Sequence, residues 1–264
     1  MKKLCSLVIC VMALLFVGCE PIAPEVIGVF SVSETKQVTF SSGNLQYHPA
    51  NNEWRFAQSQ LDYIGEANNN ISSTYNGWID LFGWSTSATY FGVSTSTDEA
   101  DYSGSFVDWG TNTIGNDEPN TWRTLSYDEW NYLLGARPNA SSLRGVAQVN
   151  GVNGLILLPD SWTCPSGVTF KSGFHNNYVD YYADHQTFTA EQWSKLESAG
   201  AVFLPAAGDR SGLIVRDVQI GGCYCSATES NSYRAYYFYF CLVDAGMFYH
   251  ARYDGQAVRL VKDL

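Results

Sequence analysis

The chain has 264 residues, with 26 acidic and 15 basic side chains and a formal net charge of −11. A surface of this charge repels nucleic acid and anionic lipid, which argues against both as partners. Aromatic residues make up 15% of the chain, so a disordered protein is excluded, and the length allows one globular domain with a sizeable core.

The first residues predict an export signal. Lys2 and Lys3 precede an apolar stretch, residues 4–17, that is too short to span a bilayer as a stable helix. Gly18 and Cys19 follow, and a small residue before a cysteine at this point resembles the lipobox that lipoprotein signal peptidase cuts. The alternative is an ordinary secretory signal with a chance cysteine.

The lipobox resemblance implies that residues 1–18 are removed, that Cys19 carries the lipid and that residues 19–35 form a tether. Residues 1–18 hold two lysines and no acid, so the remaining chain has 13 basic and 26 acidic residues and a net charge of −13. We therefore expect a cell-envelope protein, an outer-membrane lipoprotein exposed at the cell surface. It would touch the membrane only through the N-terminal lipid.

Short strands are predicted at the front of the domain. Residues 37–40, 44–48 and 53–57 alternate polar with apolar side chains between turn residues. Residues 65–121 are rich in Asn, Ser, Thr, Gly and aromatic residues but show little periodicity. They predict long ordered loops held by buried tryptophans, whose indole N–H groups need acceptors.

Two helices are marked by capping boxes. Ser126 with Glu129, and Thr189 with Gln192, have the spacing in which each side chain accepts from the backbone N–H of the other residue. Gly200 predicts the end of the second helix. Apolar stretches predict strands at 154–158 and 201–205, and the final stretch, 223–264, reads as entirely β, with runs at 235–241 and 258–261. This order predicts an α+β fold.

Several motifs together resemble a known family. They read WRTLSYDEW at 122–130, FLPAAG at 203–208, YCSATE at 224–229, VRLV at 258–261 and, at the front, VTFSSGNLQY at 38–47. The series is similar to formylglycine-generating-enzyme-like domains, and in particular to the Fibrobacter succinogenes major paralogous domain lipoproteins. The resemblance implies a single C-type-lectin-like domain over residues 36–264, with two helices and long ordered loops.

The same resemblance extends to the target proteins of diversity-generating retroelements. In those proteins a C-terminal segment of a C-type-lectin fold is rewritten by adenine-specific mutagenesis of a template rich in AAC codons. It implies that residues 223–252 are a variable ligand-binding region, in which each varied residue is encoded by an AAC codon with its adenines replaced. The predicted ligand-binding residues are Tyr233, Arg234, Tyr237, Tyr239, Cys241, Asp244, Phe248, Tyr249 and His250.

Side-chain alternation in the strand 235–241 leads to the same region. If its even-numbered residues face the core, the odd-numbered Tyr237, Tyr239 and Cys241 face water, and residues 248–250 add to them. An exposed cluster of Tyr, Phe and His is costly unless a ligand covers it, and tyrosines on a rigid frame serve as contacts in antibody paratopes. The alternative is a strand buried on both faces.

The expected partner is therefore an unidentified protein or glycan on another cell, a phage or a host surface. No catalytic motif is present, so we expect no enzyme activity and no cofactor. The alternatives are a structural subunit of a surface fibre or glycan-uptake complex, and a metal-dependent enzyme of the formylglycine-generating-enzyme superfamily.

Metal and disulfide chemistry have little support in the sequence. The formylglycine-generating enzymes bind copper through a cysteine pair, and the spacing of Cys223, Cys225 and Cys241 does not match that pair. Their spacing also fits no zinc motif. The sequence is compatible with one disulfide bond in an oxidising compartment. Loops rich in Asp, Asn and Gly could supply oxygen ligands, so the sequence is compatible with a structural calcium ion. Two interpretations fit the last candidates: a metal site, or a solvated loop. These candidates are His175, Asp180, Asp184 and His185.

Overall fold

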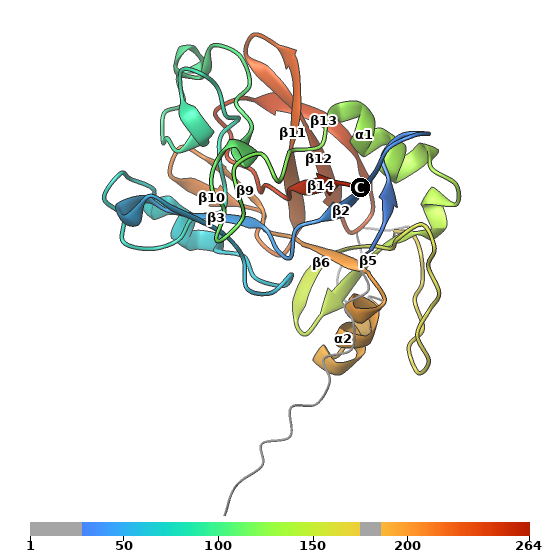
Figure 1. Ribbon diagram of the computed structural model, residues 1–264. Helices are drawn as coiled ribbons and strands as arrows, with labels where there is room; N and C mark the ends of the chain where they lie inside the picture. The colour runs from blue at the N-terminus through green and yellow to red at the C-terminus, as the bar shows by residue number, and fades with distance from the viewer. Residues whose placement is uncertain (1–27, 175–185) are drawn as a thin grey trace, which may run out of the picture.

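The computed structural model describes residues 28–174 and 186–264. Over these residues the chain is mixed α+β, with mostly short antiparallel strands and a few short helices (Figure 1). The predicted signal peptide, Cys19 and residues 20–27 of the predicted tether lie outside the described residues, as do His175, Asp180, Asp184 and His185. The prediction that the tether extends to residue 35 is wrong, because Phe30 and Val32 are buried and Phe30–Ser31 pairs with residues 37–38 in a sheet. Within the described ranges, none of the helices has the length and apolarity needed to cross a membrane.

The two ends of the described chain meet in one sheet. That sheet has the order β1-β2-β14 and consists of β1 (Phe30–Ser31), β2 (Gln37–Phe40) and β14 (Val261–Asp263). A separate hairpin pairs β3 (Leu45–His48) with β4 (Glu53–Phe56). Pairing of the first strands with the last one closes the domain on itself.

A four-stranded sheet forms the lower part of the domain in Figure 1. Its order is β7-β5-β6-β8, with β7 (Thr187–Phe188), β5 (Arg144–Val149), β6 (Val152–Leu157) and β8 (Val202–Pro205). Only the β5–β7 pair is parallel. This sheet supports the C-terminal strands described next.

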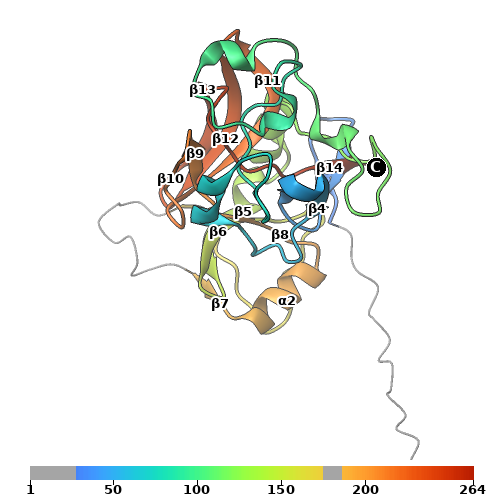
Figure 2. The same cartoon turned by 90° about the vertical axis from the view of Figure 1, so that its left-hand side faces the viewer.

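The C-terminal strands form a hairpin and a three-stranded antiparallel sheet. The hairpin pairs β9 (Asp209–Ser211) with β10 (Ile214–Arg216). The sheet has the order β11-β12-β13 and consists of β11 (Gly221–Asn231), β12 (Arg234–Cys241) and β13 (Ala245–Ala251). Figure 2 shows the hairpin beside this sheet.

Both predicted helices are present, and both capping boxes are confirmed. In α1 (Tyr127–Asn131), Ser126 Oγ accepts from Glu129 N at 3.2 Å, and Glu129 Oε2 accepts from Ser126 N at 2.9 Å. The helix continues as a π-helical turn, Tyr132–Ala136. Thr189 and Gln192 make the same pair of bonds at the start of α2 (Ala190–Ser198). Gly200, with a φ of 90°, follows the end of α2 as predicted, since this left-handed conformation suits glycine.

The long loops between β3 and β5 are held by indole rings, as the sequence predicts. Trp84 donates from Nε1 to Ser226 O at 2.9 Å, and Trp109 donates from Nε1 to Phe91 O at 3.0 Å. Both rings are buried. These loops contain short 3₁₀ helices at Pro49–Asn51, Gly65–Asn70, Tyr90–Gly92, Glu99–Tyr102, Trp109–Thr111 and Ala140–Ser142.

The predicted strands agree with the structure to within a residue or two, except in the final stretch. That stretch is not entirely β, because residues 252–260 lie between β13 and β14 and belong to no strand. The run 258–261 was expected to be a strand, but only its last residue, Val261, belongs to β14. Val258 and Leu260 instead accept single bonds, from Leu45 N at 2.8 Å and from Ser41 N at 2.9 Å. Because residues 41–44 form a turn, residues 258–260 do not pair with them in a continuous ladder of backbone hydrogen bonds.

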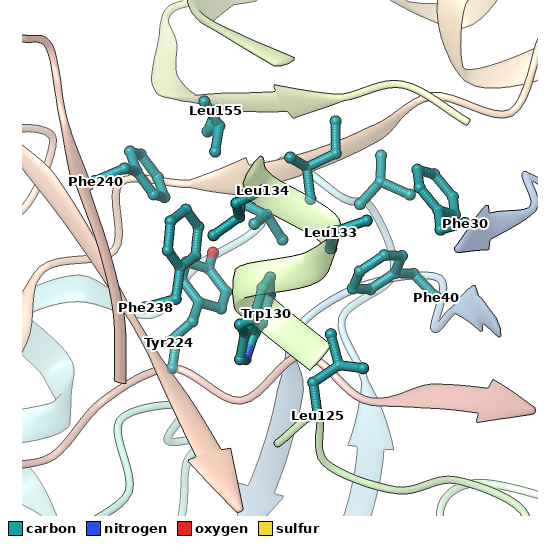
Figure 3. Packing of buried hydrophobic residues seen from close by; sticks show 14 of the residues in the cluster. Phe30, Phe40, Leu125, Trp130, Leu133, Leu134, Leu155, Tyr224, Phe238 and Phe240 are labelled. Carbon is teal, nitrogen blue, oxygen red and sulfur yellow. The ribbon is translucent and has the colours of Figure 1, made fainter. Parts of the chain in front are cut away.

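The inner face of the β11–β12–β13 sheet packs against α1. Trp130 of α1 stacks on Phe238 of β12, with ring centroids 5.0 Å apart, and Phe240 stacks on Tyr224 of β11 at 6.1 Å (Figure 3). All four rings are buried, together with Leu155 of β6. Each such ring stabilises the fold by about 2 kcal/mol through burial, so this face fixes the position of the sheet.

Candidate ligand-recognition surface

The outer face of the same sheet carries a second set of aromatic side chains. We use the term outer face for Cys223, Tyr237, Tyr239, Phe248 and His250. Cross-strand pairing places Tyr237 opposite Phe248 and Tyr239 opposite Cys223, so these side chains share one side of the sheet. Phe248 is 43% exposed, and its ring centroid lies 5.8 Å from that of Tyr239 and 6.3 Å from that of Tyr237.

A pocket of about 320 Å³ opens between the outer face and the β9–β10 hairpin. The sheet contributes one wall, and the hairpin with the residue after it contributes the other. The lining residues are Asp209, Arg216, Asp217, Cys223, Tyr237, Tyr239, His250 and Gln256. The pocket therefore combines two aromatic rings with several charged groups, and it is more polar than a typical small-molecule pocket.

Four charged or titratable side chains form a chain of contacts along one side of the pocket. Arg216 donates from Nε to Asp209 Oδ1 at 3.3 Å, and its Nη2 donates to Asp209 Oδ2 and lies 3.8 Å from Asp254 Oδ1. Asp254 in turn bonds His250 Nδ1. The bond to Asp254 raises the pKa of His250 above its usual 6.5, whereas burial raises the pKa of Asp209.

Three other side chains of the pocket, those of Cys223, Tyr237 and Tyr239, stay neutral near pH 7. Burial raises the pKa values of the Tyr237 and Tyr239 hydroxyls, so both keep their protons. Burial also raises the pKa of the Cys223 thiol well above its ordinary value. A protonated thiol is a poor nucleophile, so these groups favour contact and hydrogen bonding over covalent chemistry.

Buried contacts fix the end of the sheet that lies away from the pocket. Arg252 donates from Nη2 to Glu229 Oε2 and to Asn231 O, both at 2.7 Å. Its guanidinium carbon lies 4.4 Å from the centroid of the Trp84 ring. Because Arg252 is itself buried, these contacts hold the β11–β12 hairpin rigidly against the loops.

Four of the nine predicted ligand-binding residues come together on the outer face: Tyr237, Tyr239, Phe248 and His250. Arg234 and Tyr249 do not join them, because Tyr249 is paired opposite Tyr236 and both belong to the inner side of the sheet. At this end of the sheet the inner side is only partly covered. Tyr249 is 52% exposed there, and the Arg234 guanidinium lies 5.3 Å from its ring.

Two further predicted residues lie in turns at opposite ends of the sheet. Tyr233 is exposed in the turn between β11 and β12. Asp244 is exposed between β12 and β13, where its Oδ1 accepts from Ala245 N at 2.8 Å. Neither residue lines the pocket. The nine residues therefore do not form one continuous surface.

The prediction that Cys241 faces water is wrong. Its side chain points to the outer side by alternation, yet the residue is only 4% exposed. The last residues of β12 lie beside the β5–β6 hairpin and the 217–220 turn, and Cys241 lines a small pocket there with Asn153, Gln219 and Ile220. Local packing by distant segments overrides the alternation there.

The charged wall of the pocket has no counterpart among the residues predicted from the sequence. Asp209, Arg216 and Asp217 come from a hairpin that precedes residue 223, where the candidate region was taken to begin. The Ser211-Gly212 dipeptide before Ile214 is a turn signal that predicts a short hairpin. Its docking against the outer face depends on contacts that are distant in sequence.

The four cysteines in the described ranges, Cys164, Cys223, Cys225 and Cys241, are free thiols. Within the described part of the chain, no three His, Cys, Asp or Glu side chains lie close enough together to hold a metal ion.

Comparison with family models, with curated proteins and with solved structures gave no match to this chain. Assignment of a function therefore relies on the residues, their geometry and the motif resemblance.

Proposed function

We propose that the chain is a cell-envelope lipoprotein that displays a ligand-recognition surface on a C-type-lectin-like domain. The ligand would be a protein or glycan on another cell, a phage or a host surface. The observation that carries the proposal is the outer face. Two tyrosine rings and an imidazole line a pocket there, and the exposed Phe248 ring packs beside those tyrosines, while the opposite face of the sheet packs against the core.

The energetics of the outer face support a binding role. Aromatic rings that stay partly in water contribute less to folding than the buried Phe238 and Phe240 on the other side of the strand. Tyrosine offers a large contact area with few rotatable bonds, so little entropy is lost when a ligand covers it. A surface that contributes little to folding but offers much contact area suits recognition.

The arrangement of the sheet also supports replacement of its outer side chains. Inner residues of β12 make the ring contacts with α1 and β11, whereas the ring of Phe248 contacts those of Tyr237 and Tyr239 on the outer face. Substitutions on the outer side would thus leave the frame in place. This separation is what the resemblance to retroelement-diversified proteins requires of residues 223–252.

A binding experiment tests the proposed function. The labelled mature protein would be incubated with a glycan array and with panels of bacterial and host cells, and bound label would be measured. We expect Phe248→Ala to abolish binding to the recognised target, whereas Tyr90→Ala, which removes an exposed aromatic ring that does not belong to the outer face, keeps it. Equal binding by both variants would contradict the proposal.

A second candidate function is a structural subunit of a surface fibre or glycan-uptake complex. Leu213 and Ile214 at the tip of the β9–β10 hairpin are exposed apolar residues, which favours a lasting protein contact. The two candidates differ in the genetics of residues 223–252. If the region is diversified for recognition, a near-copy of its coding segment should lie close by, differ from it only at adenines and neighbour a reverse-transcriptase gene. If the protein is a structural subunit, its C-terminus should be invariant.

A further inference from the structure

We propose that the pocket on the outer face binds a cationic group of the ligand, a protonated amine or a guanidinium. This inference rests on the proposed recognition role of the same surface and names the chemistry that the surface selects. It follows from the charges of the lining residues, from the two tyrosines among them and from one carboxylate that has no hydrogen bond or ion pair in the described part of the chain.

The pocket has an excess of negative charge. Asp209 and Asp217 line it, and Asp254 lies directly behind His250 with a side chain that is 2% exposed. Arg216 is the only arginine or lysine among the lining residues. These four ionised side chains carry a net charge of −2 when His250 is neutral. Because Asp254 raises the pKa of His250, the protonated state also counts, and it leaves a net charge of −1. The pocket is negative in both states, so it attracts cations.

Arg216 does not neutralise all three carboxylates. Its guanidinium bonds Asp209 and lies 3.8 Å from Asp254. The Asp217 side chain has no hydrogen bond or ion pair within the described part of the chain, and it faces the same pocket. The backbone places it there: Asp217 has a φ of 56°, and its carbonyl accepts from Ile220 N and Gly221 N at the turn into β11.

The aromatic wall favours the same class of ligand. Tyr237 and Tyr239 line the pocket opposite the hairpin, and the faces of aromatic rings attract cations. Both phenols stay protonated at neutral pH, so they add ring surface and hydrogen-bonding hydroxyls without adding charge. A cation between these rings and Asp217 gains both attractions, whereas a neutral group gains only contact.

Matched pairs of small probes test the charge requirement directly. The mature protein would be titrated with glucosamine and with N-acetylglucosamine, which differ in the cationic amine. Nα-acetyl-lysinamide and Nα-acetyl-norleucinamide would form the second pair, and binding would be followed through the NMR signals of the His250 and tyrosine rings. We expect the cationic member of at least one pair to bind at least about tenfold more tightly than its neutral partner.

The two pairs also identify the source of the cation. Preference confined to the first pair indicates an amino sugar, and preference confined to the second indicates a lysine-like side chain of a protein. Equal affinities within both pairs, or no binding by any probe, would overturn the cation proposal. The recognition function would then still be judged separately, by the effect of Phe248→Ala on cell and glycan binding.

A pair of isosteric variants locates the effect. Asp217→Asn removes one charge from the pocket and keeps a residue that tolerates the left-handed backbone. We expect it to weaken binding of the cationic probe about fivefold. Asp128→Asn removes the same charge from an exposed position of α1, on the other side of the sheet, and should leave the affinity unchanged. Equal losses in the two variants would show a general charge effect and overturn the assignment to this pocket.

Discussion

Asp80 is a carboxylate with no exposed surface, and its side chain bonds only neutral groups in the described part of the chain. Its oxygens accept from Ile64 N at 2.9 Å and from Asn68 Nδ2 at 2.8 Å. Burial raises its pKa from 3.8 to about 6, because the charged form loses its hydration. The folded state therefore binds this proton more tightly than the unfolded state.

The raised pKa of Asp80 predicts a pH dependence of stability. Its contribution is fully present below pH 3.8 and is lost as the pH rises through about 6, a change of about 3 kcal/mol in the free energy of unfolding. Urea unfolding of the wild type and of Asp80→Asn between pH 4 and pH 7 measures it. We expect the wild type to lose more stability than the variant over this range, and parallel curves would contradict the assignment.

At the residue scale, alternation along β12 predicted the inner side chains well. Phe238 and Phe240 are buried, and Tyr237 and Tyr239 lie on the other side. The same rule failed for Cys241, since a distant hairpin covers the end of the strand. It also could not place Tyr249, whose side depends on the register between β12 and β13, and that register is fixed by a turn the sequence does not specify.

At the element scale, the start of α1 depends on a few local bonds. Ser126 Oγ accepts from Glu129 N, and the Glu129 carboxylate also bonds Arg123 at 2.7 and 2.9 Å. We expect Ser126→Ala to lower the free energy of unfolding by about 1 kcal/mol, because a helix N–H loses its acceptor. Ser141→Ala, at an exposed position, is the control and should change stability little. Chemical denaturation of both variants measures the difference, and equal stabilities would contradict the capping role.

Elements with local signals were predictable, and elements that depend on distant partners were not. The capping boxes and Gly200 mark both helices through residues only a few positions apart. By contrast, the run from Val258 lacks a continuous ladder because its neighbour, residues 41–44, is a turn. The β9–β10 hairpin has three residues a strand, too few for a periodic pattern to mark it.

At the scale of the whole molecule, the α+β class follows from the order of strands and helices along the chain. The pocket does not follow from it, because its two walls meet through tertiary contacts. Arg210 of β9 is fully buried and exchanges backbone hydrogen bonds with Gly255, at 2.8 and 2.6 Å, which holds the hairpin beside the sheet. No pattern in residues 209–217 alone predicts the pairing of Arg210 with Gly255.

The proposed membrane attachment is also a property of the whole molecule. We expect the wild-type protein to partition with membranes and to carry a lipid on Cys19, because buried acyl chains hold a protein to a bilayer. Cys19→Ser should abolish the lipid and release the protein into the soluble fraction, whereas Cys164→Ser should change neither. Mass spectrometry of the N-terminal peptide with cell fractionation decides this, and a lipid-free wild type would contradict it.

The central claim is that the outer face serves a ligand and the inner face serves the fold. Equilibrium unfolding of two variants tests it most directly. The double variant Tyr239→Ser with Phe248→Ser should lose no more than about 1 kcal/mol of unfolding free energy, whereas Phe238→Ala should lose about 3–5 kcal/mol. If the double variant lost as much stability as Phe238→Ala, its rings would be part of the core, and the surface would not be one for recognition.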